Sequence, residues 1–194
     1  ADLTRVRSNQ IVPGRQLNAS RAVLEADNTS LAIHGPMTLD GIAVDGRWSR
    51  ALGPGASSDS EIVASVELSP QFLDAFSIAL PPGSLTGRGS GDLVLRLRAG
   101  HAPDFTLVSD LRGVGLALPQ VGWAKSTGTR GKLLVTGALG LPPRINRLEV
   151  SGGGLDVAGR VTLNDQGGFQ TAQFERVRIG NWLDAPITLR GRGR

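Results

Sequence analysis

Apolar and polar residues alternate along several stretches of the chain with the two-residue period that is typical of β-strands. The longest stretch covers residues 155–163, where an apolar residue or glycine occupies every odd position. Shorter stretches occur at 62–68, 93–97, 132–136 and 187–190, with Val94 out of pattern in the second. Strands with one apolar and one polar face are typical of antiparallel sheets. We therefore expect strands in more than half of the ordered residues.

Turn residues separate these stretches, most clearly at 53–55, 81–83, 141–143 and 164–168. The chain of 194 residues contains 27 glycines and 11 prolines, which favours many turns over long helices. The predicted fold class is all-β: an antiparallel meander of one-sided strands, curled into a groove or an open, barrel-like repeat. Because the sequence begins without Met and ends in a strand-like run, we expect residues 1–194 to be one β-rich repeat segment of a longer protein.

One short helix is predicted at residues 69–76. Ser69 is a suitable N-cap, and Pro70 suits the first helical position, where its missing N–H costs nothing. Phe72, Leu73 and Phe76 would then share one face of the helix.

A weak repeat of the form apolar-x-x-apolar-x-apolar, followed by tryptophan, occurs three times. The copies begin at Leu39, Leu111 and Phe174, and they precede Trp48, Trp123 and Trp182 respectively. A repeat that cannot bury its apolar face alone is typical of arrays in which each unit packs on its neighbours.

Residues for catalysis or metal binding are scarce. There is no cysteine, and the two histidines have no partner at a ligand spacing; we expect His34 at a strand end and His101 in a turn. The sequence also lacks a G-x-S-x-G nucleophile motif. The glycine-rich segments 87–91 and 151–154 precede predicted strands, whereas a phosphate-binding loop precedes a helix. We therefore predict no enzymatic activity, no cofactor and no metal.

Charge gives little indication of a partner. The 21 basic and 17 acidic residues are interleaved, and aromatic residues do not alternate with arginine clusters as they do in nucleic-acid binding strands. We therefore expect no nucleic-acid partner. No stretch approaches 18 consecutive apolar residues, so the sequence itself shows no membrane-spanning helix.

From about residue 65 onward the sequence resembles the AsmA-like proteins of double-membraned bacteria, in particular the YhdP branch. The likeness is carried by the segments 66–76, 109–119, 122–125, 150–155 and 174–182. The resemblance implies antiparallel sheets curled into an apolar groove through which phospholipid acyl chains move toward the outer membrane. It further implies a periplasmic location, a parent protein anchored in the inner membrane, and contacts with other envelope proteins.

Strands with one apolar face and one polar face are compatible with two different functions. The first is a groove that binds or conducts lipid, because an aliphatic surface with few polar groups suits acyl chains. The second is a non-catalytic structural β-sandwich or scaffold module whose apolar face is closed by its own side chains. For the groove we predict one shared apolar surface, with Arg96, Arg98, Lys132, Arg160 and Thr188 facing water. The predicted lipid-facing residues are Leu93, Leu95, Leu97, Leu133, Val135, Val157, Val161, Leu163, Ile187 and Leu189.

Overall fold

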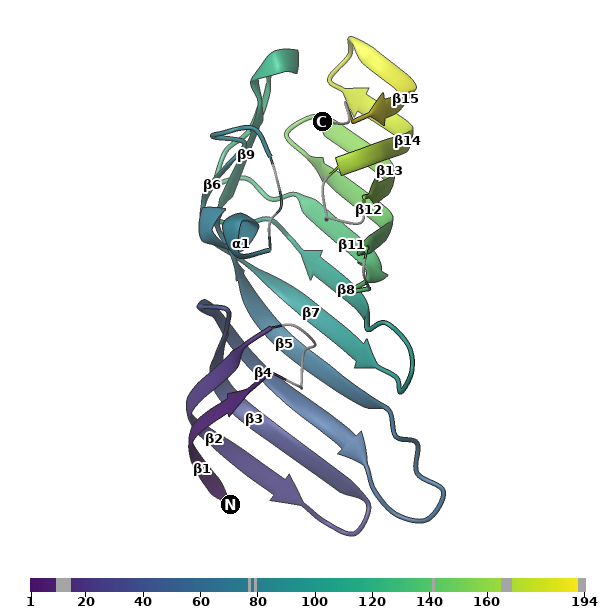
Figure 1. Ribbon diagram of the computed structural model, residues 1–194. Coiled ribbons are helices and arrows are strands. Elements are labelled where there is room, and N and C mark those ends of the chain that lie inside the picture. Colours follow the sequence, from purple (N-terminus) through teal and green to yellow (C-terminus); the bar gives the residue numbers. More distant parts are fainter. Residues whose placement is uncertain (10–14, 77, 79, 141, 165–168, 192–194) are drawn as a thin grey trace.

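The computed structural model of the chain describes residues 1–9, 15–76, 78, 80–140, 142–164 and 169–191 (Figure 1). Most of these residues are in strands, and the α-helix found among them is six residues long. The predicted all-β, antiparallel organisation is therefore confirmed.

The main sheet contains twelve strands. They are β1 (Asp2–Ser8), β2 (Leu17–Ala26), β3 (Ser30–Leu39), β4 (Ile42–Ala51), β5 (Ser60–Leu68), β7 (Gly89–Leu97), β8 (Asp104–Ser109), β11 (Lys132–Ala138), β12 (Arg144–Gly152), β13 (Leu155–Leu163), β14 (Phe169–Ile179) and β15 (Leu183–Arg190). Every strand is antiparallel to its neighbours, and the strands follow one another in the order of the sequence.

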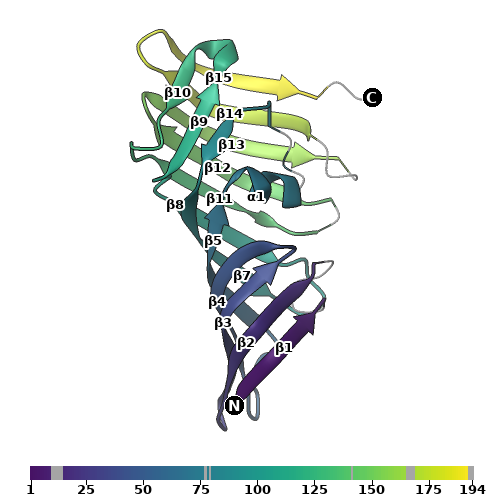
Figure 2. The same cartoon turned by 90° about the vertical axis from the view of Figure 1, so that its left-hand side faces the viewer.

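The main sheet is open, with β1 and β15 as its two edge strands. At a spacing of about 4.8 Å between neighbouring strands, twelve strands extend over roughly 50 Å. The sheet is strongly twisted, so that β1 and β15 lie at opposite ends of the molecule and run in clearly different directions (Figures 1 and 2).

A second sheet is built from two insertions into the meander. The first lies between β5 and β7 and contains the helix α1 (Pro70–Ala75) and β6 (Leu85–Gly87). The second lies between β8 and β11 and contains β9 (Val114–Leu118), the 3-10 turn η1 (Pro119–Val121) and β10 (Trp123–Lys125). The three short strands pair in the order β10-β9-β6, so the two insertions form one layer beside the main sheet (Figure 1).

The helix begins and ends close to the predicted bounds. Ser69 occupies the N-cap position and Pro70 the first helical position, but the buried Ser69 hydroxyl makes no capping hydrogen bond. The other end is held by Arg15, which donates to the carbonyl of Ala75 at 2.7 Å and to the carboxylate of Asp40 at 2.9 Å. The Arg15 guanidinium also lies 4.7 Å from the ring centre of Phe76, so three contacts fix the helix to the β3–β4 turn.

The register of the main sheet places its apolar side chains on one side, which we call the apolar face. Paired residues in antiparallel strands point to the same face, and residues two apart in a strand do as well. One such row runs through Ala64, Leu93, Leu107, Val135 and Leu148 on five successive strands. The small sheet and α1 contribute to the same hydrophobic cluster, so they lie against this face.

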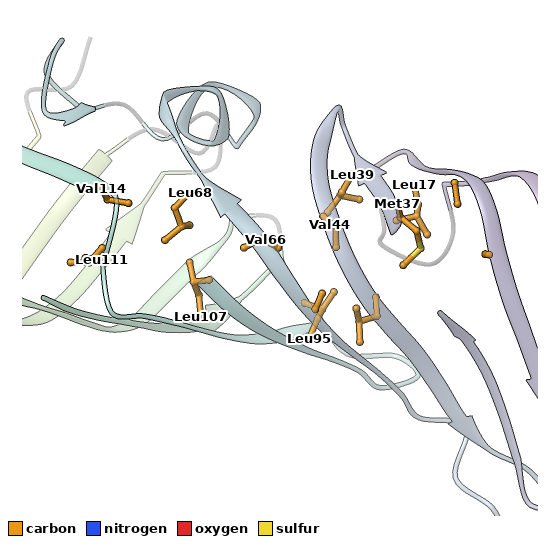
Figure 3. Packing of buried hydrophobic residues seen from close by; sticks show 14 residues of the cluster. Leu17, Met37, Leu39, Val44, Val66, Leu68, Leu95, Leu107, Leu111 and Val114 are labelled. Carbon is orange, nitrogen blue, oxygen red and sulfur yellow. The ribbon is translucent and has the colours of Figure 1, made fainter. Parts of the chain in front are cut away.

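Two glycines in the main sheet allow unusually close contacts on the apolar face. Leu68 of β5 and Leu107 of β8 point toward one another (Figure 3), and a Cβ atom on Gly91 between them would lie 2.9 Å from Leu107 and 3.3 Å from Leu68. A Cβ atom on Gly46 would lie only 2.6 Å from that of its partner Ala64. Since paired Cβ atoms are normally about 5 Å apart, the sheet bends sharply between β4 and β5.

The three copies of the weak sequence repeat occupy different structures. The first spans the β3–β4 turn, the second enters β9 of the small sheet, and the third lies within β14. Their tryptophans also differ: Trp123 is buried, Trp48 is partly buried, and Trp182 is 62% exposed. The copies therefore provide no structural repeat unit.

Candidate functional site: an apolar face with a polar rim

All ten predicted lipid-facing residues lie on the apolar face. In the first half of the sheet, Leu93, Leu95 and Leu97 occupy alternate positions of β7. In the second half, the register joins Leu133 to Val157 through Val150, and Val161 to Leu189 through Ala172. The remaining members, Val135, Leu163 and Ile187, follow by the two-residue alternation within β11, β13 and β15.

These ten residues differ in burial. Leu95 is only 3% exposed and belongs to the core, whereas Leu189 is 49% exposed. The other eight are partly exposed. The predicted set therefore combines one core residue with nine residues whose side chains reach solvent.

The apolar face of β2 to β7 forms a packed core. Leu17, Met37, Leu39, Val44 and Val66 are all buried in one cluster that extends to Val114 of the small sheet (Figure 3). A small cavity of about 40 Å³ remains in this region and is lined entirely by apolar residues. It has room for one or two methylene groups, so a longer chain would have to lie along the surface.

Several of the residues around this cavity were absent from the predicted set, among them Met37, Trp48 and Ile62. The alternation of Ile42, Val44 and Trp48 in β4 is a signal that could have identified part of this surface.

The apolar face of β11 to β15 is much more open. Among the residues that the structure describes, β12 and β15 contain no buried side chain at all. Leu148 and Val150 of β12, like Val157 and Val161 of β13, are partly exposed. A second, smaller buried cluster lies where the small sheet covers this half, around Trp123, Leu155 and Ile179.

Two polar side chains fix the small sheet in place. The Nζ of Lys125 is surrounded by three carbonyl groups, those of Leu111, Val114 and Ser126, at 2.7, 2.8 and 3.1 Å. Burial lowers the pKa of Lys125 below its ordinary value. The indole N–H of Trp123 donates to the carbonyl of Gly153 at 2.8 Å, which joins β10 to the β12–β13 turn. Lys125 thus has a structural role, because its hydrogen-bonding capacity is used by the fold.

The opposite face of the main sheet is polar and carries cross-strand ion pairs. Arg96 of β7 binds Glu61 of β5 at 3.1 Å, and Lys132 of β11 binds Glu149 of β12 at 3.1 Å. Arg98 binds Asp104, and Arg160 donates to Gln173 at 2.9 Å. Four of the five residues predicted to face water thus have polar partners on this face, and the fifth, Thr188, is exposed.

A cavity of about 570 Å³ lies at one rim of the sheet, where residues of both faces line it, and we call it the rim pocket. It is formed by the ends of β3, β4, β5, β7 and β8 and by adjacent loop residues. The loops that join β2 to β3, β4 to β5 and β7 to β8 project from this side of the sheet (Figure 1). Its wall includes three arginines, namely Arg50, Arg96 and Arg98, and the acidic residues Asp59, Glu61 and Asp104.

The β2–β3 turn beside the rim pocket is organised by Asp27. Its carboxylate accepts hydrogen bonds from the Thr29 hydroxyl and backbone N–H at 2.7 Å each and from the backbone N–H of Ser30. These bonds lower its pKa from 3.8 to about 2. These hydrogen bonds stabilise the charged carboxylate of Asp27 in the folded state. The stabilisation is therefore fully present above the ordinary pKa of 3.8 and is lost as the pH falls toward about 2.

Asp27→Asn is therefore expected to lower the melting temperature at pH 7 and to differ little from the parent protein near pH 2. Thermal denaturation across this pH range measures the difference. Asp45→Asn removes the same charge from β4 without breaking a turn hydrogen bond and serves as the control. A melting difference for Asp27→Asn that is the same at pH 7 and pH 2 would contradict the assignment.

Neither histidine lines the rim pocket or the small apolar cavity. His34 lies in the middle of β3, not at a strand end as predicted, because β3 continues for five residues beyond it; its Nε2 lies 3.2 Å from the carboxylate of Glu25. His101 lies in the β7–β8 connection, as predicted. Within the described part of the chain, no three histidine or acidic side chains are grouped as a metal site would require.

The described helices are all too short or too polar to cross a membrane. Comparison of the chain with family models, with curated proteins and with solved structures finds no match.

Proposed function

We propose that the protein binds lipid acyl chains along the apolar face of its main sheet, which acts as an open groove. The observation that carries this proposal is the row of partly exposed aliphatic side chains on β11 to β15. The second layer consists of three short strands and one helix, which is too little to cover a twelve-stranded sheet. Soluble proteins rarely leave aliphatic surfaces of this extent without a ligand or a partner.

The chemistry of the surface supports an acyl chain over a polar ligand. Between Leu133 in β11 and Leu189 in β15, the paired residues on the apolar face are aliphatic residues, glycine, alanine and Phe174. None of them is charged. Such a surface has no polar group to fix the orientation of a small molecule, whereas an acyl chain needs none. Transport of phospholipid between two membranes, as the AsmA-like resemblance implies, would use the same surface as a path.

The structural module remains the second candidate. The core of β2 to β7 favours it, because Ala22, Leu95 and Val66 are each less than 6% exposed and need no ligand to exclude water. The two candidates differ in what the apolar face of β11 to β15 contacts: acyl chains in one case, another protein in the other.

Substitution of Val135 and Val161 by aspartate separates these functions. Both side chains are partly exposed, so a carboxylate there can remain hydrated, and we expect each variant to melt within a few degrees of the parent protein. Binding of a fluorescent acyl chain should fall about tenfold or more, because the chain would have to cover a charge. Native mass spectrometry of the purified protein reports co-purified phospholipid independently.

The matched controls are Thr136→Asp and Thr162→Asp, which place the same charge one residue away on the opposite face. They should leave acyl binding unchanged. Leu95→Asp shows the loss of stability expected for a fully buried position. Burial of an unpaired carboxylate in the core should unfold the protein. Collapse of Val135→Asp and Val161→Asp to the same extent as Leu95→Asp would support the closed structural module instead.

A further inference from the structure

We propose that the outer edge of β15 binds an extended peptide segment in which acidic and aliphatic residues alternate, and that this segment joins the main sheet as an added antiparallel strand. The site consists of residues 187–190, which we call the β15 edge. The inference goes beyond the proposed function, because it assigns a protein partner to a strand edge and leaves the apolar face to the acyl chain.

The register determines which backbone groups of the β15 edge face away from β14. Gly191 donates its N–H to the carbonyl of Gln170 at 2.7 Å, so these two residues form a hydrogen-bonded pair. In antiparallel strands such pairs alternate with pairs whose N–H and C=O groups point to the outer sides. Thr188 and Arg190 therefore direct their N–H and C=O groups away from β14, where the described sheet has no further strand. The backbone of an added strand can bond to these groups.

The other parts of the two sheet edges are less suitable for strand addition. Pro186 occupies the same outward position as Thr188 and Arg190, but it has no N–H to donate. At the opposite edge of the main sheet, Arg5 interrupts β1 with a φ of 53°, far from strand geometry. The β15 edge contains neither interruption.

The polar side of the β15 edge is basic. Arg190 lies in one row with Arg144 across β12 to β15, and Arg160 lies in the next row; all three are exposed. Elsewhere on the polar face, Arg96 and Lys132 pair with carboxylates of neighbouring strands. Among the described residues, by contrast, Arg144, Arg160 and Arg190 have no carboxylate within 4.0 Å. Acidic side chains of a partner would balance this positive charge.

The apolar side of the β15 edge is aliphatic. Leu189 is 49% exposed, and Ile187 is partly exposed. Successive residues of an added strand would point alternately to the polar face near Arg190 and to the apolar face near Leu189. A segment of alternating acidic and aliphatic residues therefore matches both sides of the edge. A basic segment would be repelled by the arginines, and a wholly polar one would leave Leu189 uncovered.

The test measures binding of a short fluorescent peptide of alternating glutamate and leucine to the purified protein by anisotropy. Arg190→Gln should weaken binding about tenfold, as expected for the loss of one charge-assisted hydrogen bond. Arg96→Gln is the matched control, because Arg96 lies on the same face but already pairs with Glu61 at 3.1 Å. The same peptide with lysine in place of glutamate should bind about tenfold more weakly than the glutamate peptide. Equal binding of the two peptides would overturn the acidic partner.

Methylated peptides test the hydrogen bonds on the unaltered protein. Opposite Thr188 and Arg190, the residues of an antiparallel partner whose N–H groups face β15 are those with side chains on the polar face, which are the glutamates. Methylation of the glutamate nitrogens should abolish binding, and methylation of the leucine nitrogens should leave it within about twofold of the parent peptide. Equal binding of the two methylated peptides would contradict strand addition.

Thr188→Pro separates the β15 edge from the apolar face. The N–H that it removes points out of the sheet, where proline is accepted, so this variant should fold and bind acyl chains but lose peptide binding. Val135→Asp should do the reverse, with peptide binding unchanged. Loss of peptide binding in Val135→Asp but not in Thr188→Pro would place the peptide on the apolar face and overturn the edge site. A dimer in sedimentation that Thr188→Pro dissociates would assign the edge to a second copy of the chain instead of an acidic partner.

Discussion

Gly46→Val is expected to destabilise the protein by about 3 kcal/mol, the upper range for adding atoms to a packed site. The Cβ atom alone would lie 2.6 Å from the Cβ of Ala64 and 2.9 Å from the carbonyl oxygen of Val63. These contacts involve the backbone and a side chain without rotamers, so no flexible group can move aside. Urea denaturation followed by circular dichroism measures the loss.

The bend between β4 and β5 explains why this one glycine should matter so much. A wider separation of the two strands would relieve the clash, but it would also open the core around Val44 and Val66. Gly46→Ala should give an intermediate loss. Gly128→Val is the matched control, because a Cβ atom there meets nothing within 4 Å. Equal stabilities of Gly46→Val and Gly128→Val would show that the sheet does not bend sharply at this point.

Lys125→Met should also cost about 3 kcal/mol. Methionine preserves the apolar part of the side chain, but it removes the donors that satisfy the carbonyls of Leu111, Val114 and Ser126. A buried acceptor left without a donor costs about 1–3 kcal/mol, and Lys125 itself is only 2% exposed. The loss should appear in urea denaturation and as faster hydrogen exchange in β9 and β10.

Lys132→Met is the control for this prediction, because Lys132 is the other lysine of the chain and lies on the polar face. Its ammonium pairs with Glu149 at 3.1 Å, but the side chain is 62% exposed. Surface ion pairs contribute about 0–1 kcal/mol, so the control should lose little stability. If the two lysine variants were equally stable, the buried ammonium would not be what holds the small sheet.

The two-residue alternation predicted five strands of the main sheet, β5, β7, β11, β13 and β15, and the side of the sheet to which their residues point. In 93–97 and 155–163 the two-residue alternation is nearly unbroken, and the face of each side chain follows directly from strand geometry. The same geometry explains why all ten predicted residues share one face.

Burial could not be predicted in the same way, because it depends on what lies opposite each residue. Leu93 and Leu95 have the same local pattern, yet only Leu95 is buried. The small sheet was also missed: β6 and β10 are three residues long, too short for a period to be visible. The rim pocket is lined by strand ends and loops that are distant in the sequence, so no local spacing predicts its lining.

The order of strands in the main sheet allows its length to change without disturbing its connections. Each strand pairs only with its predecessor and its successor in the sheet, and no connection crosses over another strand of that sheet. Duplication or loss of one hairpin would therefore add or remove about 10 Å and leave the remaining pairings intact. Because a hairpin contains two strands, the direction of every following strand, and the side on which its apolar residues lie, would also be kept. Gene duplication of this kind would change the length of such a sheet in steps of one hairpin.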